Sequence, residues 1–201
     1  MKKDYYLVTI IGFLVGWLVL LPAKNLGLTL SADLISASVI GFTLLAPIAL
    51  FVLKKLSRFW AVFDQFGKFA AVGTLNTLLD LGVLNLLMFL TGFYSGFPFA
   101  GFKSVSFLVG TTNSYFWNKL WTFQSKLPVT VAEYIRFGLF TLVGALINVS
   151  VASLIVNVIG APAGMDLKLW ANLGALMAVF AGFLWNFLSY RNIVFKTKTS
   201  G

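Results

Sequence analysis

Long apolar stretches alternate with short polar segments along the whole chain. Six stretches approach the roughly 20 residues that a helix needs to cross a bilayer. None of them alternates apolar and polar residues with the period of two that is typical of a membrane barrel. The pattern therefore predicts an all-α, polytopic membrane protein with six transmembrane helices. The six stretches are residues 5–21, 34–53, 69–91, 99–118, 135–160 and 168–190.

Turn-forming residues separate several of these stretches. Proline, glycine and asparagine in residues 22–25, 92–98 and 160–164 predict short hairpin connections. The longest connection, residues 119–136, contains Pro128 and the amphipathic stretch 129–134. We expect this connection at the cytoplasmic interface.

Composition agrees with a membrane protein, because 59% of the 201 residues are hydrophobic and only 10% are charged. So little charge cannot cover the surface of a soluble domain. Residues 5–21 follow Lys2 and Lys3, as in a signal peptide, but a second apolar stretch follows closely and no small-residue cleavage site separates the two. We therefore expect a retained helix. The chain has no cysteine and no histidine, which excludes disulfides and thiolate or imidazole metal sites.

Lysine and arginine positions predict the orientation. Twelve of the fifteen fall in the N-terminal segment, in alternate connections and in the C-terminal tail, so both termini are expected in the cytoplasm. Because these cations lie between apolar stretches and form no basic face, nucleic acid is not an expected partner. The twelve are Lys2, Lys3, Lys54, Lys55, Arg58, Lys68, Lys119, Lys126, Arg136, Arg191, Lys196 and Lys198.

Polar residues also indicate an internal repeat, because four pairs of similar residues are each separated by 72 positions. The pairs are Asn76 and Asn148, Asn85 and Asn157, Lys119 and Arg191, and Phe123 and Phe195. The last four stretches then form a four-helix core of two parallel two-helix repeats. The first two stretches form an additional N-terminal hairpin. This predicts a hairpin domain at residues 1–60 and a four-helix domain at residues 61–201.

Asp80 is the one acidic residue deep inside an apolar stretch. An ionised carboxylate there is costly unless it is paired or faces water, which favours a functional role. The alternative is a structural contact that joins two helices. Lys103 is the candidate partner, although its long side chain could instead extend to the interface.

Asparagines in the last four stretches could hydrogen-bond neighbouring helices or line a pocket for hydroxyl-rich head groups. These are Asn76, Asn113, Asn118, Asn148, Asn172 and Asn186. At the cytoplasmic ends of two stretches, Lys119 and Arg191 could hold a lipid phosphate. They could equally be ordinary positive-inside anchors.

Catalysis has little support in the sequence. It contains no nucleophile–base pair, no metal-ligand cluster and no phosphate-binding glycine loop. The acidic residues Asp64 and Glu133 each stand alone in a cytoplasmic connection. We therefore expect a non-enzymatic protein without a metal or cofactor.

Three segments, residues 69–80, 103–106 and 118–123, resemble the GtrA-like family, and residues 136–137, 143–144, 185–187, 191 and 195 fit its second half. The resemblance covers about residues 66–196. It implies a small protein of the bacterial cytoplasmic membrane that moves polyprenyl-phosphate-linked monosaccharides across the bilayer for cell-surface polysaccharide synthesis. The positions that match the family's motif are Asn76, Asp80, Lys103, Asn118 and Lys119. Tyr190 and the pair Asn192–Ile193 depart from the second motif.

The resulting hypothesis is a protein that binds and flips a lipid-linked sugar. In this hypothesis Asp80 and the asparagines contact hydroxyls, whereas Lys119, Arg191 and Lys103 contact the phosphate. One alternative is an anchor that recruits a glycosyltransferase, and another is a proton-coupled exporter of cations or drugs that works through Asp80. Expected partners are the lipid-linked sugar, membrane lipids, a membrane-associated glycosyltransferase and a second copy of the chain.

Overall fold

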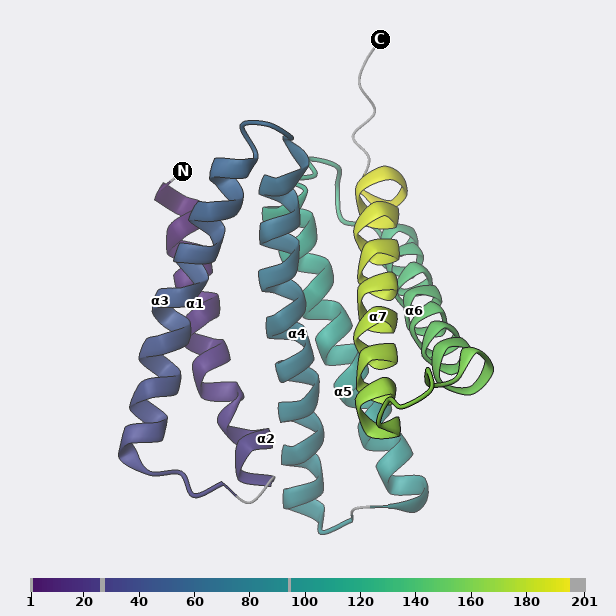
Figure 1. Ribbon diagram of the computed structural model, residues 1–201. Coiled ribbons are helices and arrows are strands. Elements are labelled where there is room, and N and C mark those ends of the chain that lie inside the picture. The colour runs from purple at the N-terminus through teal and green to yellow at the C-terminus, as the bar shows by residue number, and fades with distance from the viewer. Residues whose placement is uncertain (1, 26–27, 94, 196–201) are drawn as a thin grey trace. The chain divides into compact units, whose positions relative to one another are not determined.

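The computed structural model describes residues 2–25, 28–93 and 95–195, and every regular element in these ranges is a helix (Figure 1). The predicted all-helical architecture is thereby confirmed. The α-helices are α1 (Lys2–Leu18), α2 (Leu20–Asn25), α3 (Ala32–Leu56), α4 (Val62–Thr91), α5 (Gly96–Trp117), α6 (Val131–Ser153) and α7 (Leu167–Ser189). Three π-helical segments follow α5, α6 and α7: η1 (Asn118–Thr122), η2 (Leu154–Ile159) and η3 (Tyr190–Val194). Lys196 and Lys198 lie outside the described residues.

Four helical stretches in the described chain are long and apolar enough to cross a membrane. These are Ala32–Leu56, Val62–Thr91, Val131–Ile159 and Leu173–Val194. Neither α1 nor α5 is among them. With 17 residues, α1 spans only about 26 Å, and the 22 residues of α5 include serines, threonines, an asparagine and a lysine. The six spans predicted from the sequence therefore remain a prediction.

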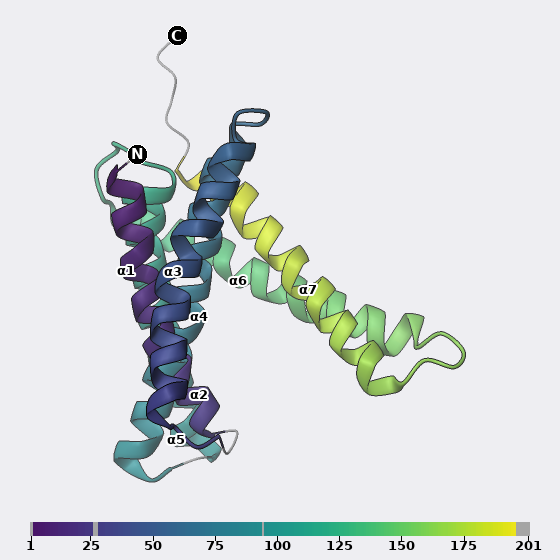
Figure 2. The ribbon, with the colours of Figure 1, turned by 60° about the vertical axis from the view of Figure 1, so that its left-hand side comes forward.

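The chain divides into two compact units, one up to Gln124 and the other from Ser125 onward. In the first unit, α1 packs on α3, and α4 contacts α1, α2, α3 and α5 (Figure 2). One buried apolar core joins α1, α3, α4 and η1: Val8, Ile11, Val15, Leu50, Val72, Leu75 and Trp121. The helices α1 and α3 share this core with α4 and η1. The domain boundary predicted at residue 60 stays a prediction.

Small residues let α1 and α3 approach closely. A Cβ atom on Gly16 would lie 2.7 Å from Cα of Val39, so only glycine fits there. The Ser38 hydroxyl donates a 2.8 Å hydrogen bond to the Gly16 carbonyl across the same contact. The N-terminal hairpin is thus closely packed.

In the second unit, α6 packs against α7, and η2 and η3 complete the hairpin. A Cβ atom on Gly182 would come within 2.8 Å of the Gly144 carbonyl oxygen, which shows how closely the two helices cross. At the end near η3, the rings of Phe137 and Tyr190 have centroids 4.3 Å apart. The second unit is therefore held by close backbone approach and ring packing.

Two predicted connections differ from the structure. A turn at residues 22–25 was expected, but α2 runs through them, because Pro22 lies in its first turn, where a proline removes no helical hydrogen bond. The long connection expected at residues 119–136 is shorter, because η1 extends to Thr122 and α6 begins at Val131. The Thr130 hydroxyl caps α6 by accepting a 3.1 Å bond from the Glu133 amide. The turn after α4 does occur where expected, at Gly92, whose φ is 74°.

Candidate functional site

A charged cluster joins α4 to α5 at Asp80. The ammonium group of Lys103 pairs with one carboxylate oxygen of Asp80, and the Ser106 hydroxyl donates a 2.5 Å hydrogen bond to the other. The expected Asp80–Lys103 pair therefore forms. Ser106 is fully buried, whereas the side chains of Asp80 and Lys103 are 23% and 46% exposed. An ion pair that is partly open on the side of an apolar helix can exchange partners with a polar ligand.

An amide pair lies one turn along the same interface. The Asn113 side-chain amide donates a 2.6 Å hydrogen bond to the Asn76 carbonyl oxygen, and the Asn76 amide nitrogen is buried without a partner among the described residues. Gly110 separates this pair from the charged cluster, and a Cβ atom there would contact both Asn76 and Asp80 at 3.6 Å. The two groups therefore form one polar column between α4 and α5.

The π-helical turn η1 continues this column at the end of α5. The Asn118 side-chain amide donates 2.9 Å and 3.2 Å hydrogen bonds to the carbonyl and hydroxyl oxygens of Ser114. The side-chain carbonyl oxygen of Asn118 is buried without a partner in the described chain. Lys119 is only 1% exposed and has interactions of its own. Among the predicted phosphate contacts, Lys119 is thus the least accessible in this conformation.

The predicted residues of the second unit occupy a different setting. Asn186 lies directly against Gly144, and its carbonyl oxygen has no partner among the described residues. The Cβ atom of Asn148 lies 3.4 Å from the Cβ position of Gly182. Arg191 lies on η3 and is exposed. These three residues belong to another compact unit than Asp80.

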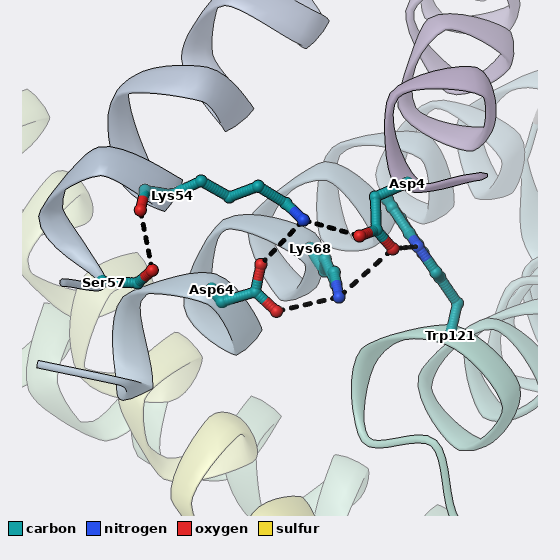
Figure 3. Close-up of polar contacts among 6 residues, drawn as sticks. All are labelled: Asp4, Lys54, Ser57, Asp64, Lys68 and Trp121. Atoms are coloured by element: carbon teal, nitrogen blue, oxygen red, sulfur yellow. Dashed lines mark hydrogen bonds and ion pairs between the residues drawn. The ribbon is translucent and has the colours of Figure 1, made fainter. Parts of the chain in front are cut away.

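The sequence prediction missed a ring of four charged side chains in the first unit (Figure 3). The Lys54 ammonium lies 2.5 Å from Asp4 and 3.3 Å from Asp64, and the Lys68 ammonium lies 3.3 Å from Asp4 and 2.8 Å from Asp64. The Trp121 indole donates a 3.1 Å hydrogen bond to Asp4. The ring therefore connects the ends of α1, α3, α4 and η1. The prediction that Asp64 stands alone was wrong.

Burial and pairing set the acidity of this ring. Burial raises the pKa of Asp4, but the hydrogen bonds from Lys54 and Trp121 and the positive charge of Lys68 outweigh it, so the pKa falls from its usual 3.8 to about 2. The Lys68 side chain is only 2% exposed and is fully enclosed by its two acidic partners and the helices. The one sequence signal of this ring is the i,i+4 spacing of Asp64 and Lys68. The Lys54–Asp64 contact joins residues 10 positions apart, and the contacts of Asp4 join residues 50 or more positions apart.

Within the described residues, no group of three or more acidic side chains could hold a metal ion. The chemistry available in the α4–α5 column is therefore hydrogen bonding and ion pairing. Its donors and acceptors are the carboxylate of Asp80, the ammonium group of Lys103, the hydroxyls of Ser106 and Ser114, and three side-chain amides.

Comparisons with known proteins give the context of this column. The model of the family described as "GtrA/DPMS, transmembrane domain" matches residues 68–195. An "Uncharacterized membrane protein YngA" of Bacillus subtilis (strain 168) is 34% identical over 119 residues, which make up 58% of this chain and 74% of that protein. No solved structure matches. The matched region begins at Lys68 in α4 and covers the rest of the α4–α5 hairpin and the α6–α7 hairpin. It leaves out α1, α2 and α3.

Proposed function

The chain belongs to the GtrA/DPMS transmembrane-domain family, and on that premise we propose that it binds a polyprenyl-phosphate-linked monosaccharide and moves its head group across the membrane. The single observation that supports this most is the polar column of α4 and α5. It combines the Asp80–Lys103–Ser106 cluster with the Asn76–Asn113 pair between two helices of a membrane protein.

A lipid-linked sugar presents three different chemistries to a membrane protein. Its tail is apolar, its phosphate is anionic, and its sugar carries hydroxyls that cost several kcal/mol each when they enter hydrocarbon without partners. The column offers carboxylate and amide groups for the hydroxyls. The unpartnered amide nitrogen of Asn76 and carbonyl oxygen of Asn118 add one donor and one acceptor.

Cations for the phosphate occur at several depths. Lys103 is half-exposed beside Asp80, and Arg191 is exposed at the end of the second hairpin. Lys119 would need to leave its buried position before it could bind a ligand. We propose that the phosphate contacts Lys103 or Arg191, and that Arg191→Ala weakens lipid binding most at low salt, because screening is weakest there.

The direct test is transport by purified protein in liposomes that contain a fluorescent polyprenyl-phosphate sugar. An impermeant quencher reports the fraction of the lipid in the outer leaflet, and protein-free liposomes serve as the control. We expect the protein to speed the exchange between leaflets. If the protein neither binds nor moves the lipid but captures a membrane-bound glycosyltransferase, the anchor function replaces this proposal.

We also propose six membrane crossings in the bacterial cytoplasmic membrane, with both termini in the cytoplasm. The chain has no cysteine, so single cysteines can be introduced and labelled with an impermeant thiol reagent. Cysteines at positions 95 and 163, in the connections after α4 and after η2, should be labelled from outside intact cells. Cysteines at positions 56 and 126 should be labelled only after permeabilisation. The reverse pattern would overturn this orientation.

A further inference from the structure

An open groove runs between α1, α4 and α5 in the first unit and has a volume of about 730 Å³. This volume is within the range of small-molecule sites. Its wall includes Lys3 and Leu7 from α1, Leu79 from α4, and Val109 and Asn113 from α5. The family match begins only at residue 68, so α1 contributes a wall that the family description does not include.

The groove is amphipathic along its length. From Leu108 to Leu120, its wall follows thirteen residues of α5 and η1, which rise by about 18 Å along the helix. The Lys3 end is fixed beside η1, because the neighbouring Asp4 accepts the hydrogen bond from Trp121. Leu79 lies at the other end, next to Asp80 in the sequence. The groove thus extends from a cation at the end of α1 to the level of the charged cluster.

Asn113 makes this groove continuous with the polar column. It lines the groove and donates its hydrogen bond to Asn76. Most of the remaining wall is aliphatic or aromatic. A ligand that is complementary to this groove therefore has an anionic group at one end and an apolar body. It also carries polar groups that can hydrogen-bond to the side-chain amides of Asn113 and Asn76.

We propose that this groove holds the phosphate-proximal part of the single isoprenoid chain of a polyprenyl phosphate when the lipid first binds. The phosphate then lies at Lys3, before the head group moves to its contact with Lys103 or Arg191. This assignment rests on the proposed function and adds the N-terminal hairpin to the lipid site. Charge complementarity supports it, because a cation near a membrane surface attracts an anionic head group. The shape supports it as well, because one groove accommodates one chain, whereas a phospholipid carries two.

The test uses a polyprenyl phosphate that carries a diazirine on its chain and no sugar, with the full-length protein in phosphatidylcholine nanodiscs. After illumination, mass spectrometry locates the labelled peptides. We expect labels on the segments that contain Leu7, Leu79 and Val109. Unlabelled polyprenyl phosphate should compete for the label, whereas an equal amount of phosphatidylglycerol should not.

Two matched pairs of variants sharpen the test. Val109→Trp fills the groove and should lower labelling by about tenfold, the effect of overfilling a packed site. The control is Val105→Trp, because Val105 lies one turn away on α5 and outside the groove. This variant should be labelled as strongly as the wild type. Lys3→Gln should lower labelling by about fivefold, because it removes the cation that lines the end of the groove. Lys2→Gln, at the adjacent exposed lysine, should not.

The outcomes separate this assignment from the proposed function. If the wild type moves the lipid in liposomes but the labels fall only on α6 and α7, the groove assignment is wrong and the proposed function stands. Equal effects of the two tryptophan variants, or competition by phosphatidylglycerol, would also overturn the groove. If the wild type neither transports nor captures the probe, both proposals fail.

Discussion

In the hairpin of α4 and α5, polar side chains contact one another between the helices. Asp80 bonds to Lys103 and Ser106, and Asn113 bonds to Asn76. In the hairpin of α6 and α7, the corresponding contacts are mainly made by backbone and rings. A Cβ atom on Gly182 would nearly touch the Gly144 carbonyl, and the Trp185 indole donates to the Phe140 carbonyl.

The two hairpins nevertheless share a spacing. The π-helical turn of the first begins at residue 118 and that of the second at residue 190, which is 72 residues on. In both turns, the amide of a phenylalanine closes the π-helix with a 2.8 Å hydrogen bond, from Phe123 to Asn118 and from Phe195 to Tyr190. π-Helical turns often mark functional positions. The common spacing supports the proposed repeat.

The difference lies in the residues that occupy equivalent places. At the place 72 residues after Asp80 the second hairpin has Ala152, and at the place of Asn118 it has Tyr190, whose hydroxyl lies 2.6 Å from the Thr141 hydroxyl. We infer that the first hairpin carries the ligand-binding groups. In this proposal the second hairpin contributes close packing and, at its end, the Arg191 cation.

The largest expected effect concerns the cations at the beginnings of the two hairpins. Lys68 is buried between Asp4 and Asp64, whereas Arg136 is exposed, although each precedes a phenylalanine. Lys68→Met should lower the free energy of unfolding by about 3–5 kcal/mol, because it leaves buried acids with fewer partners. Arg136→Met should change it by less than about 0.5 kcal/mol.

Thermal unfolding in detergent, followed by circular dichroism, measures both variants. Equal melting temperatures for the two would show that the ring contributes little to stability. Lys68 and Arg136 would then not differ in their contribution to stability.

A smaller effect is expected from matched glycines on α5 and α7. Gly110 and Gly182 are 72 residues apart, but an added Cβ atom has 3.6 Å of space at Gly110 and only 2.8 Å at Gly182, where backbone lies opposite. Gly182→Ala should therefore cost about 1–3 kcal/mol of stability through overpacking. Gly110→Ala should be nearly neutral. If Gly110→Ala is the more damaging change, the second hairpin is not the more tightly packed one.

Much of this architecture follows from hydrophobic pattern alone. The helices α3, α4, α6 and α7 lie where long apolar stretches predicted them, because length and composition dominate in a membrane. The Asp80–Lys103 contact was also predictable, since an intramembrane charge needs a partner.

The charged ring was not predictable, because it depends on how α1, α3 and α4 pack. Asp4 meets Lys54 and Lys68 only after three helices come together, and no periodicity in the sequence encodes that contact. The same applies to Lys119. Its sequence position indicated a phosphate ligand at the membrane surface, whereas the turn of η1 buries it. The position of a positive charge along the chain therefore does not predict whether its side chain is buried.

Asp80→Asn should lower transport by about tenfold, equivalent to about 1.4 kcal/mol, while the protein remains folded. The reason is that the carboxylate bonds to both Lys103 and Ser106 and has no equivalent in the second hairpin. The double variant Asp80→Asn/Lys103→Gln separates the possible roles. If Asp80 only neutralises Lys103, the double variant regains transport, whereas it stays low if the carboxylate contacts the sugar. Normal transport by Asp80→Asn would remove this residue from the site.

The last prediction concerns how the stability of the first unit changes in acid, where only the ion pairs of Asp4 are tested. The pKa of Asp4 is about 2 in the folded protein, below its ordinary value of 3.8. Its ion pairs therefore contribute their full stability above about pH 4, and this contribution is lost as the pH falls from 3.8 through about 2. The wild type should lose melting temperature over that window, whereas Asp4→Asn, already less stable at pH 7, should lose less. The two proteins should converge near pH 2 if the ring is the cause. Parallel curves for the wild type and Asp4→Asn would mean that acid acts elsewhere, and that the α1–α3–α4 junction does not depend on the charge of Asp4.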